Sequence, residues 1–136
     1  MAERNTELRD GTLITPPVAA TTKIEAGKLA CANAAGYAVE GSTAATLTAL
    51  GRAEETVDNS AGAAGDQRVQ VRRGTFKFAN SATNAVTQAS LGKTVYIEDD
   101  QTVAKDNGAA GENPATKSAA GKCVELDSDG VWVEIL

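Results

Sequence analysis

The sequence contains no histidine, so it lacks the side chain whose ordinary pKa best suits proton transfer near neutral pH. Without histidine, neither Cys31 nor Cys123 has the usual base that would activate its thiol as a nucleophile. Aromatic residues make up only 4% of the chain, so the ring platforms typical of a sugar-cleaving cleft are scarce. We therefore expect a protein that is not an enzyme and has no catalytic residues.

Large aliphatic side chains are also few. Leu, Ile, Val and Phe together supply 25 of the 136 residues, and much of the remaining hydrophobic fraction is alanine, which buries little area. The net charge of -5 is too modest to favour a disordered chain. A thin core with strand-like patterning indicates a subunit that completes its burial against copies of itself. We expect a homo-oligomer with closed symmetry, a trimer or a dimer.

Basic residues are scattered, and the only adjacent pair is Arg72–Arg73, which argues against a nucleic-acid partner. No apolar run approaches the roughly 20 residues that span a bilayer, so we expect no membrane contact. Residues 1–11 are charged and lack the apolar stretch of a signal peptide, which favours an intracellular product. Cys31 and Cys123 match no metal-binding spacing, and free buried thiols are favoured over a disulfide.

Short segments rich in Thr, Val, Ile and aromatics, separated by Gly, Asn, Asp and Ser, predict β-strands. They are TKIEAG, KLACAN, GYAVEG, TLTALGRAEETV, QRVQVRRGTFKFA, KTVYIED, QTVAKD, KCVELD and GVWVEIL. In the last segment, Val131, Val133 and Ile135 alternate onto one face. Trp132 falls on the opposite face, where packing at an edge or interface is favoured over a role as a ligand platform.

The connections between these segments carry turn and loop signals. Residues 127–130 read Asp-Ser-Asp-Gly and predict a hairpin turn in which Gly130 takes a positive φ. Residues 80–92 offer the only short helical alternative. The Gly- and Ala-rich stretches 59–67 and 107–121 predict mobile or partner-facing loops. The expected fold is all-β: a compact β-barrel or β-sandwich of short antiparallel strands with at most one short helix.

Residues 1–17 show no sustained period of 2 or 3.6 and end at two prolines, which predicts an extended N-terminal arm. A frayed terminus explains the same pattern equally well. We divide the chain into an arm at 1–21 and a single β domain at 22–136. If the arm docks on a partner, its contact residues are the large aliphatics and the closing prolines: Leu8, Leu13, Ile14, Pro16 and Pro17.

The stretch SLGKTVYIEDD, residues 90–100, resembles a phosphate loop followed by a metal site. A phosphate loop requires glycine five residues before Gly92, where this chain has Thr87, and it must open a helix rather than a strand. The carboxylates at 98–100 lie between two strand signals and lack the spacing of a calcium loop, so they indicate a turn. We expect no nucleotide, metal or other cofactor.

Four segments in order, TKIEAGKLACANAAGYAVEG, GRAEETVDNSAGAAGDQRVQVRRGTFKFAN, LGKTVYIEDDQTVAKD and AAGKCVELDSDGVWVEIL, together resemble the small capsid cement or decoration proteins of tailed bacteriophages. The resemblance covers roughly residues 22–136 and depends on a set of weak motifs. It implies a compact β domain, commonly oligomeric, that binds the outside of the capsid and reinforces contacts between coat subunits. The family has no catalytic residues.

The resemblance predicts a virion structural protein that stabilises the phage head. Its partners are the major capsid protein and further copies of itself, placed at local three-fold positions. It is made in the cytoplasm of the bacterial host and ends on the capsid exterior. The alternative is a carbohydrate- or host-surface-binding β module of a phage appendage, in which the loops 59–67 and 107–121 hold the ligand.

The rejected phosphate loop yields a direct test. Replacing Lys93 with Ala is expected to change the free energy of unfolding by no more than about 0.5 kcal/mol, as is usual at surface sites. Equilibrium dialysis with ATP is expected to show no binding by either protein. ATP binding that is lost in the Lys93→Ala variant contradicts this interpretation.

Overall fold

The computed structural model describes residues 2–9 and 11–136, and these form an all-β structure with one short 3₁₀ turn at Gln88–Ser90. None of the described residues forms a helix long and apolar enough to cross a bilayer. The strands are β1 (Leu13–Ile14), β2 (Thr22–Ile24), β3 (Leu29–Ala32), β4 (Ala38–Glu40), β5 (Thr48–Ala53), β6 (Val57–Asn59), β7 (Val71–Arg72), β8 (Gly74–Asn80), β9 (Thr94–Ile97), β10 (Thr102–Ala104), β11 (Ala119–Asp127) and β12 (Gly130–Ile135).

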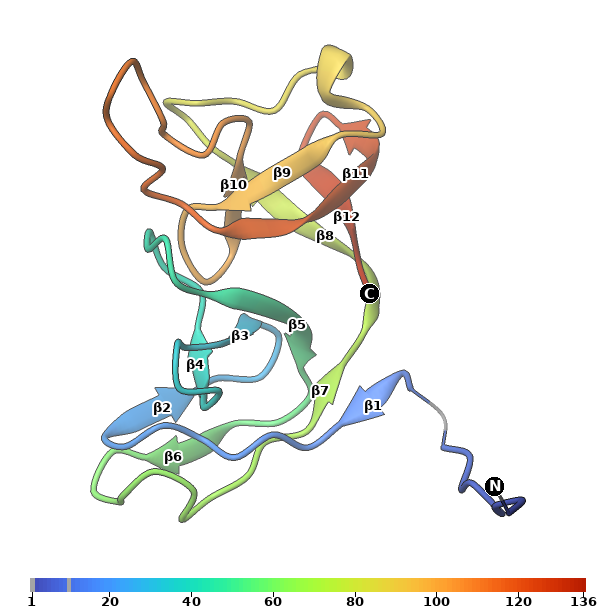
Figure 1. Ribbon diagram of the computed structural model, residues 1–136. Helices are drawn as coiled ribbons and strands as arrows, with labels where there is room; N and C mark the ends of the chain where they lie inside the picture. Colours follow the sequence, from blue (N-terminus) through green and yellow to red (C-terminus); the bar gives the residue numbers. More distant parts are fainter. Residues whose placement is uncertain (1, 10) are drawn as a thin grey trace.

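The C-terminal half of the chain closes into a barrel with the strand order β10-β8-β12-β11-β9. All of its pairs are antiparallel except β10 with β8, which is parallel. Closure leaves no free strand edge in this part of the molecule. The barrel forms the upper body in Figure 1. The expected all-β fold is therefore confirmed, with a barrel as its main element.

The N-terminal half forms two smaller sheets below the barrel (Figure 1). One has five strands in the order β1-β7-β5-β3-β4, and the other pairs β2 with β6. The chain passes from this lower body to the barrel where β7 is followed by β8. Two bodies with their own sheets thus stand one above the other.

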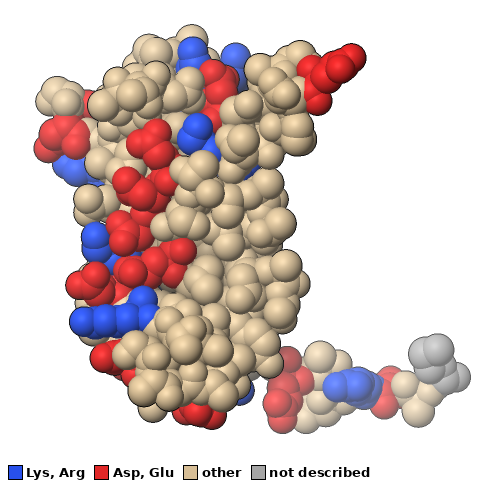
Figure 2. Space-filling view, turned by 90° about the vertical axis from the view of Figure 1, so that its left-hand side faces the viewer, with Lys and Arg blue, Asp and Glu red and all other residues tan. Residues whose placement is uncertain are grey.

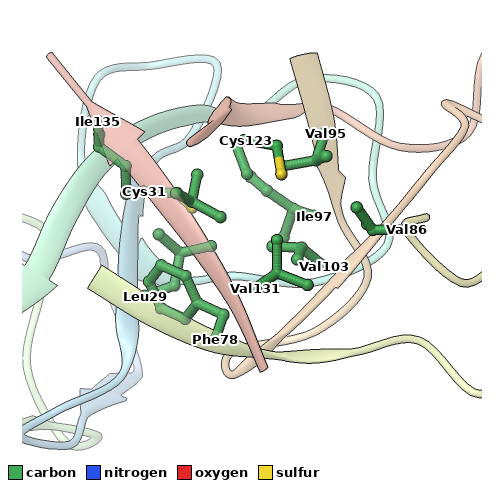
Figure 3. Close-up of a cluster of buried hydrophobic side chains, with 12 residues drawn as sticks. Leu29, Cys31, Phe78, Val86, Val95, Ile97, Val103, Cys123, Val131 and Ile135 are labelled. Atoms are coloured by element: carbon green, nitrogen blue, oxygen red, sulfur yellow. The ribbon is translucent and has the colours of Figure 1, made fainter. Parts of the chain in front are cut away.

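Side chains that alternate between the two faces of each strand fill the interior of the barrel. Val131, Val133 and Ile135 are buried, whereas Trp132 lies half-buried on the opposite face of β12, as the sequence predicts. The barrel core, part of which is shown in Figure 3, consists of Leu29, Cys31, Phe78, Val86, Val95, Ile97, Val103, Ala120, Cys123, Val131, Val133 and Ile135.

The core in Figure 3 also contains two side chains from the lower body, Leu29 and Cys31 of β3. Ala30, which lies between them, is buried in a second apolar cluster with Val18 and Ile24. Because successive side chains of a strand point to opposite faces, β3 separates the two cores and contributes to both. The lower body and the barrel are therefore packed into one unit.

Backbone hydrogen bonds reinforce this junction. The turn between β9 and β10 lies against the start of β3, where the Leu29 amide donates to the Asp100 carbonyl at 2.8 Å. The Leu29 carbonyl in turn accepts from the Gly41 amide at 2.9 Å. Close by, the Lys28 ammonium is 3.2 Å from a carboxylate oxygen of Asp100. Backbone pairing and one ion pair thus hold the barrel on the lower sheet.

The turn between β11 and β12 differs from the sequence-based expectation. Gly130 pairs with Asp127 as the first residue of β12, and its φ is not positive. The glycine is required for a different reason, because a Cβ at this position would lie 3.0 Å from the carbonyl oxygen of Phe78 and 2.6 Å from Lys77 Cγ. The neighbouring strand β8 therefore packs directly over the place where a side chain would stand.

One further expectation needs adjustment. The loop expected at 107–121 ends earlier, since β11 begins at Ala119. The segment 80–92 forms a single 3₁₀ turn, in agreement with the short helical alternative expected there, and Val86 is its only buried large aliphatic residue. Cys31 and Cys123 are free and buried, as the sequence predicts, and burial raises the pKa of the Cys31 thiol to about 12.

Gly51 in β5 gives a test of close backbone packing. Its φ is 151°, and a Cβ here would overlap the carbonyl oxygen of Arg72 on β7. We expect Gly51→Ala to lower the free energy of unfolding by about 1 to 3 kcal/mol in urea denaturation. Gly11→Ala is the matched control, since its Cβ would meet nothing within 4 Å. Equal effects of the two substitutions would contradict the packing argument.

Candidate interaction surface

The N-terminal arm, residues 2–9, is exposed along its described length and forms no strand. Leu8 has 99% of its surface accessible, the highest value among the exposed large apolar side chains of the described chain. Near the root of the arm, the Arg9 guanidinium donates a hydrogen bond to the Leu13 carbonyl at 3.3 Å. Figure 1 shows the arm leaving the body at β1 and pointing away from it. An apolar side chain and a length of backbone are thus presented to solvent.

The other aliphatic residues assigned to the arm lie in the folded body. Leu13 and Ile14 form β1 and pair with Arg72 and Val71 of β7. Ile14 also packs against the lower apolar cluster. The folded part therefore begins near residue 11 rather than at 22, and the exposed arm is shorter than the sequence suggests. A two-residue strand is too short to show a period, which is why the pattern did not reveal it.

The two prolines lie half-buried just after β1, and their carbonyls hold the chain to neighbouring segments. Pro16 accepts a hydrogen bond from the Val69 amide at 3.1 Å, and Pro17 accepts one from the Ala38 amide at 2.8 Å. Proline lacks an amide hydrogen but keeps its carbonyl acceptor, so both residues suit the border of a sheet. Their role in this structure is to anchor the root of the arm.

Trp132 lies apart from the arm, on the outside of the barrel. Its indole Nε1 donates a hydrogen bond to an Asp127 carboxylate oxygen at 2.7 Å. The Lys77 ammonium lies 5.8 Å from the ring centroid, within the range of a cation–π contact. The same ammonium is 3.2 Å from Asp129. The structure therefore does not bring Trp132 together with Leu8, Leu13 or Ile14.

An open groove of about 610 Å³ lies between β5 and the barrel. We call it the inter-body groove, and it is lined by Leu47, Thr48, Ala49, Thr94, Ala119, Ala120, Gly121, Lys122, Glu134, Ile135 and Leu136. Leu136 is an exposed apolar residue at its rim, with 85% of its surface accessible. Most of the lining is small or aliphatic, so the groove suits an extended, partly apolar segment.

The groove continues to the root of the arm. A second hollow of about 240 Å³ shares Ile135 and Leu136 with the first. Its remaining lining is Gly11, Thr12, Arg73 and Gly74. One apolar depression thus extends from the place where the arm leaves the body to the junction between β5 and the barrel. The sequence does not reveal this surface, because its parts come from separate segments at 47–49, 94, 119–122 and 134–136.

Part of the β5 edge along this groove has no strand beside it. On one side β5 pairs with β3 through residues 48–52. On the other side β7 reaches only Arg52 and Ala53. Within the described strands, residues 48–50 are therefore unpaired on that side. An uncovered strand edge presents amide and carbonyl groups that can bond an added strand.

Charged side chains gather on a different part of the surface, in a column along one side of the view in Figure 2, beside a broad uncharged area. At the junction of the two bodies, four charged residues form a cluster: Glu25, Lys28, Glu40 and Asp100. The Glu25 amide donates to a Glu40 carboxylate oxygen at 3.3 Å.

No group of three or more His, Cys, Asp or Glu residues suited to a metal ion occurs within residues 2–9 and 11–136.

The stretch that resembles a phosphate loop behaves as the spacing predicts. Gly92 and Lys93 lead directly into strand β9 rather than into a helix. Asp99 accepts a hydrogen bond from the Gln101 amide at 2.9 Å, the local turn interaction expected of an aspartate between two strands. These residues form the connection between β9 and β10.

The two loops expected to face a partner lie at opposite ends of the molecule in Figure 1. The loop after β6 is held to the body, since the Asn59 side-chain amide donates to the carbonyls of Ala19 and Ala63 at 2.9 and 3.0 Å. The loop before β11 projects from the barrel (Figure 1). The two loops do not form a common binding site.

Comparison of the chain with protein-family models, curated proteins and solved structures found no match. The arm, the inter-body groove and the uncovered β5 edge are therefore interpreted from their own geometry and chemistry.

The acidic cluster gives a pH-dependent prediction. Burial raises the pKa of Glu40, and the nearby carboxylates of Asp100 and Glu25 add to the shift, opposed by the Glu25 amide and the Lys28 ammonium. A raised pKa in the folded state means that this carboxyl favours folding at low pH and loses that contribution as the pH rises. We expect the stability of the Glu40→Gln variant, relative to that of the unmodified protein, to be greater at pH 7 than at pH 4. The ordinary glutamate pKa of about 4.3 lies within this range, near its lower end.

Urea denaturation at the two pH values measures this difference. Glu3→Gln in the exposed arm is the control for the loss of one negative charge outside the folded body. A Glu40→Gln variant whose relative stability is the same at both pH values, or falls as the pH rises, is inconsistent with a carboxyl disfavoured by burial.

Proposed function

We propose that this protein is a non-enzymatic structural protein of a bacteriophage virion, which binds the outer surface of the capsid and reinforces contacts between coat subunits. The observation that carries the proposal is the exposed N-terminal arm, which displays Leu8 and an unpaired length of backbone beside a compact β body. The sequence resemblance over residues 22–136 points to the same role. An all-β body is also what that resemblance implies.

The energetics suit attachment by many copies. Full burial of a leucine side chain contributes roughly 1.5 to 3 kcal/mol, whereas fixing the backbone costs roughly 1 to 2 kcal/mol per residue. One arm therefore binds weakly unless its backbone also forms hydrogen bonds, for example by adding a strand to a sheet edge. On a shell, the subunits of one oligomer engage together, and linked binding events multiply the overall affinity.

The proposed partners are the major capsid protein and further copies of this chain. We favour a trimer at local three-fold positions, with a dimer as the alternative. The protein is made in the cytoplasm of the bacterial host and ends on the exterior of the capsid. Neither a nucleic acid nor a membrane is a partner in this proposal.

The alternative, a carbohydrate- or host-surface-binding module, requires the loops 59–67 and 107–121 to hold a ligand. Their separation in Figure 1 removes the basis for one shared site. Aromatic platforms are scarce as well, since the chain contains one Trp, two Tyr and two Phe. We therefore retain capsid reinforcement as the proposed function.

The arm supplies the test of this function. Deleting residues 2–9 spares β1, so the body is expected to keep its melting temperature and circular dichroism spectrum. Attachment to capsids of the encoding phage that were prepared without the protein is expected to weaken severalfold or more. The deletion removes Leu8 and its backbone, which contact either the coat protein or a neighbouring copy of the attached oligomer. Co-sedimentation with these capsids, followed by densitometry against the coat protein, measures both affinity and copy number.

Two point variants sharpen the result. Leu8→Ser is expected to weaken attachment in the same direction as the deletion. Leu91→Ser, at an exposed leucine of the barrel, is the matched control and is expected to bind as the unmodified protein does. The proposal fails if the full chain does not co-sediment with capsids, or if native particles carry it in only a few dozen copies, as an appendage protein would be.

A further inference from the structure

We propose that the inter-body groove of one copy receives the N-terminal arm of a neighbouring copy, so that exchanged arms hold the oligomer together. The inference depends on the self-association proposed above and not on attachment to a capsid. It assigns an occupant to the depression that runs from Gly11 to the junction between β5 and the barrel. The arm residues placed there are 2–9.

The dimensions of the two parts agree. The arm leaves the body at Gly11 and Thr12, which themselves line one end of the depression. At about 3.3 Å per residue, eight extended residues reach roughly 26 Å beyond the root of the arm, toward an adjacent copy. The groove is open along its length and has a volume of about 610 Å³. It therefore admits a strand and several side chains without rearrangement of the body.

The side chains are complementary as well. Leu8 is an exposed apolar residue of the arm, and the exposed Leu136 and the adjoining Ile135 form the apolar part shared by both hollows. On the arm, Leu8 is flanked by Glu7 and Arg9. The groove presents Lys122 and Glu134, which pair with each other across β11 and β12. An arm with Leu8 against Leu136 brings one charge of each sign near its opposite.

The uncovered edge of β5 also offers hydrogen-bond partners to the backbone of the arm. Residues 48–50 of β5 have a strand on one side only, and two of them, Thr48 and Ala49, line the groove. Since the side-chain gain of Leu8 alone does not offset the ordering of eight residues, hydrogen bonds to this edge are needed for net stability. The groove supplies the uncovered edge and the apolar contact in the same place.

A neighbouring copy is favoured over the same chain by the direction of the arm. The pairing of Leu13 with Arg72, and the hydrogen bond from the Arg73 amide to the Thr12 carbonyl at 2.7 Å, fix how the chain leaves the body. In Figure 1 the described arm extends away from the C-terminus, and Leu136 at that terminus lines the groove. In a closed ring each copy gives one arm and receives one, so every groove is filled.

Engineered disulfides test the exchange in purified protein without capsids. Leu8→Cys and Leu136→Cys are both at highly exposed positions, and the native Cys31 and Cys123 are fully buried, so they do not compete for oxidation. A mixture of the two single variants is expected to form a covalent heterodimer under mild oxidation. The double variant is expected to form covalent oligomers of the size of the native assembly. Non-reducing electrophoresis and intact mass measure both products.

The control pairs Leu8→Cys with Val124→Cys, an exposed position on the barrel outside the groove, and is expected to cross-link far less. A double variant that closes its disulfide within one chain shows that the arm fills its own groove and overturns the proposal. The proposal is also overturned if the protein is an oligomer by sedimentation but the Leu8 and Leu136 variants do not cross-link above the control. A protein that is monomeric and forms no cross-link contradicts it as well. Loss of capsid attachment with cross-linking intact affects only the proposed function.

Discussion

The structure depends on one strand that serves two apolar cores. Leu29 and Cys31 of β3 complete the interior of the barrel, whereas Ala30 between them belongs to the cluster under the lower sheets. Large aliphatic residues are scarce in the chain, so neither body has enough of them for a large core of its own. Because both cores contain side chains of β3, the few large apolar residues are buried in one packed unit. The hydrogen bond from the Leu29 amide to the Asp100 carbonyl fixes the relative position of the two bodies.

Sequence patterns predicted the parts of this fold that follow local rules. Alternation identified the buried face of β12, and the position of Asp99 between two strand signals identified a turn that its side chain stabilises. They did not predict β1, because two residues show no period, nor the parallel pairing of β10 with β8, because pairing partners are set by the packing of the whole barrel. Gly130 was expected to serve turn geometry, yet its small size serves the close approach of β8.

The candidate site also has one part that the sequence predicted, the arm, and one part that it did not, the groove. An exposed arm with Leu8 was predictable, since an aliphatic residue in a charged, aperiodic segment is visible in the sequence. The groove beside its root was not, because Ala49, Lys122 and Leu136 come together only through the contact between β5 and the barrel. A surface assembled from both bodies is present only when those bodies are packed. Binding at the groove and the integrity of the junction are therefore linked, and a ligand there stabilises the junction by mass action.

The shared strand also has a consequence for how the chain folds during synthesis. Residues of β3 emerge from the ribosome about 100 residues before Ile135, where the last of the barrel strands that cover Leu29 and Cys31 ends. At typical rates of about 5 to 20 residues per second, one face of β3 stays uncovered for several seconds after its translation. The lower body is then a half-finished structure with an apolar side open to solvent. That side carries Leu29, Cys31 and the neighbouring Val39 and Leu47, so it stays open to contacts with other apolar surfaces until the barrel covers it.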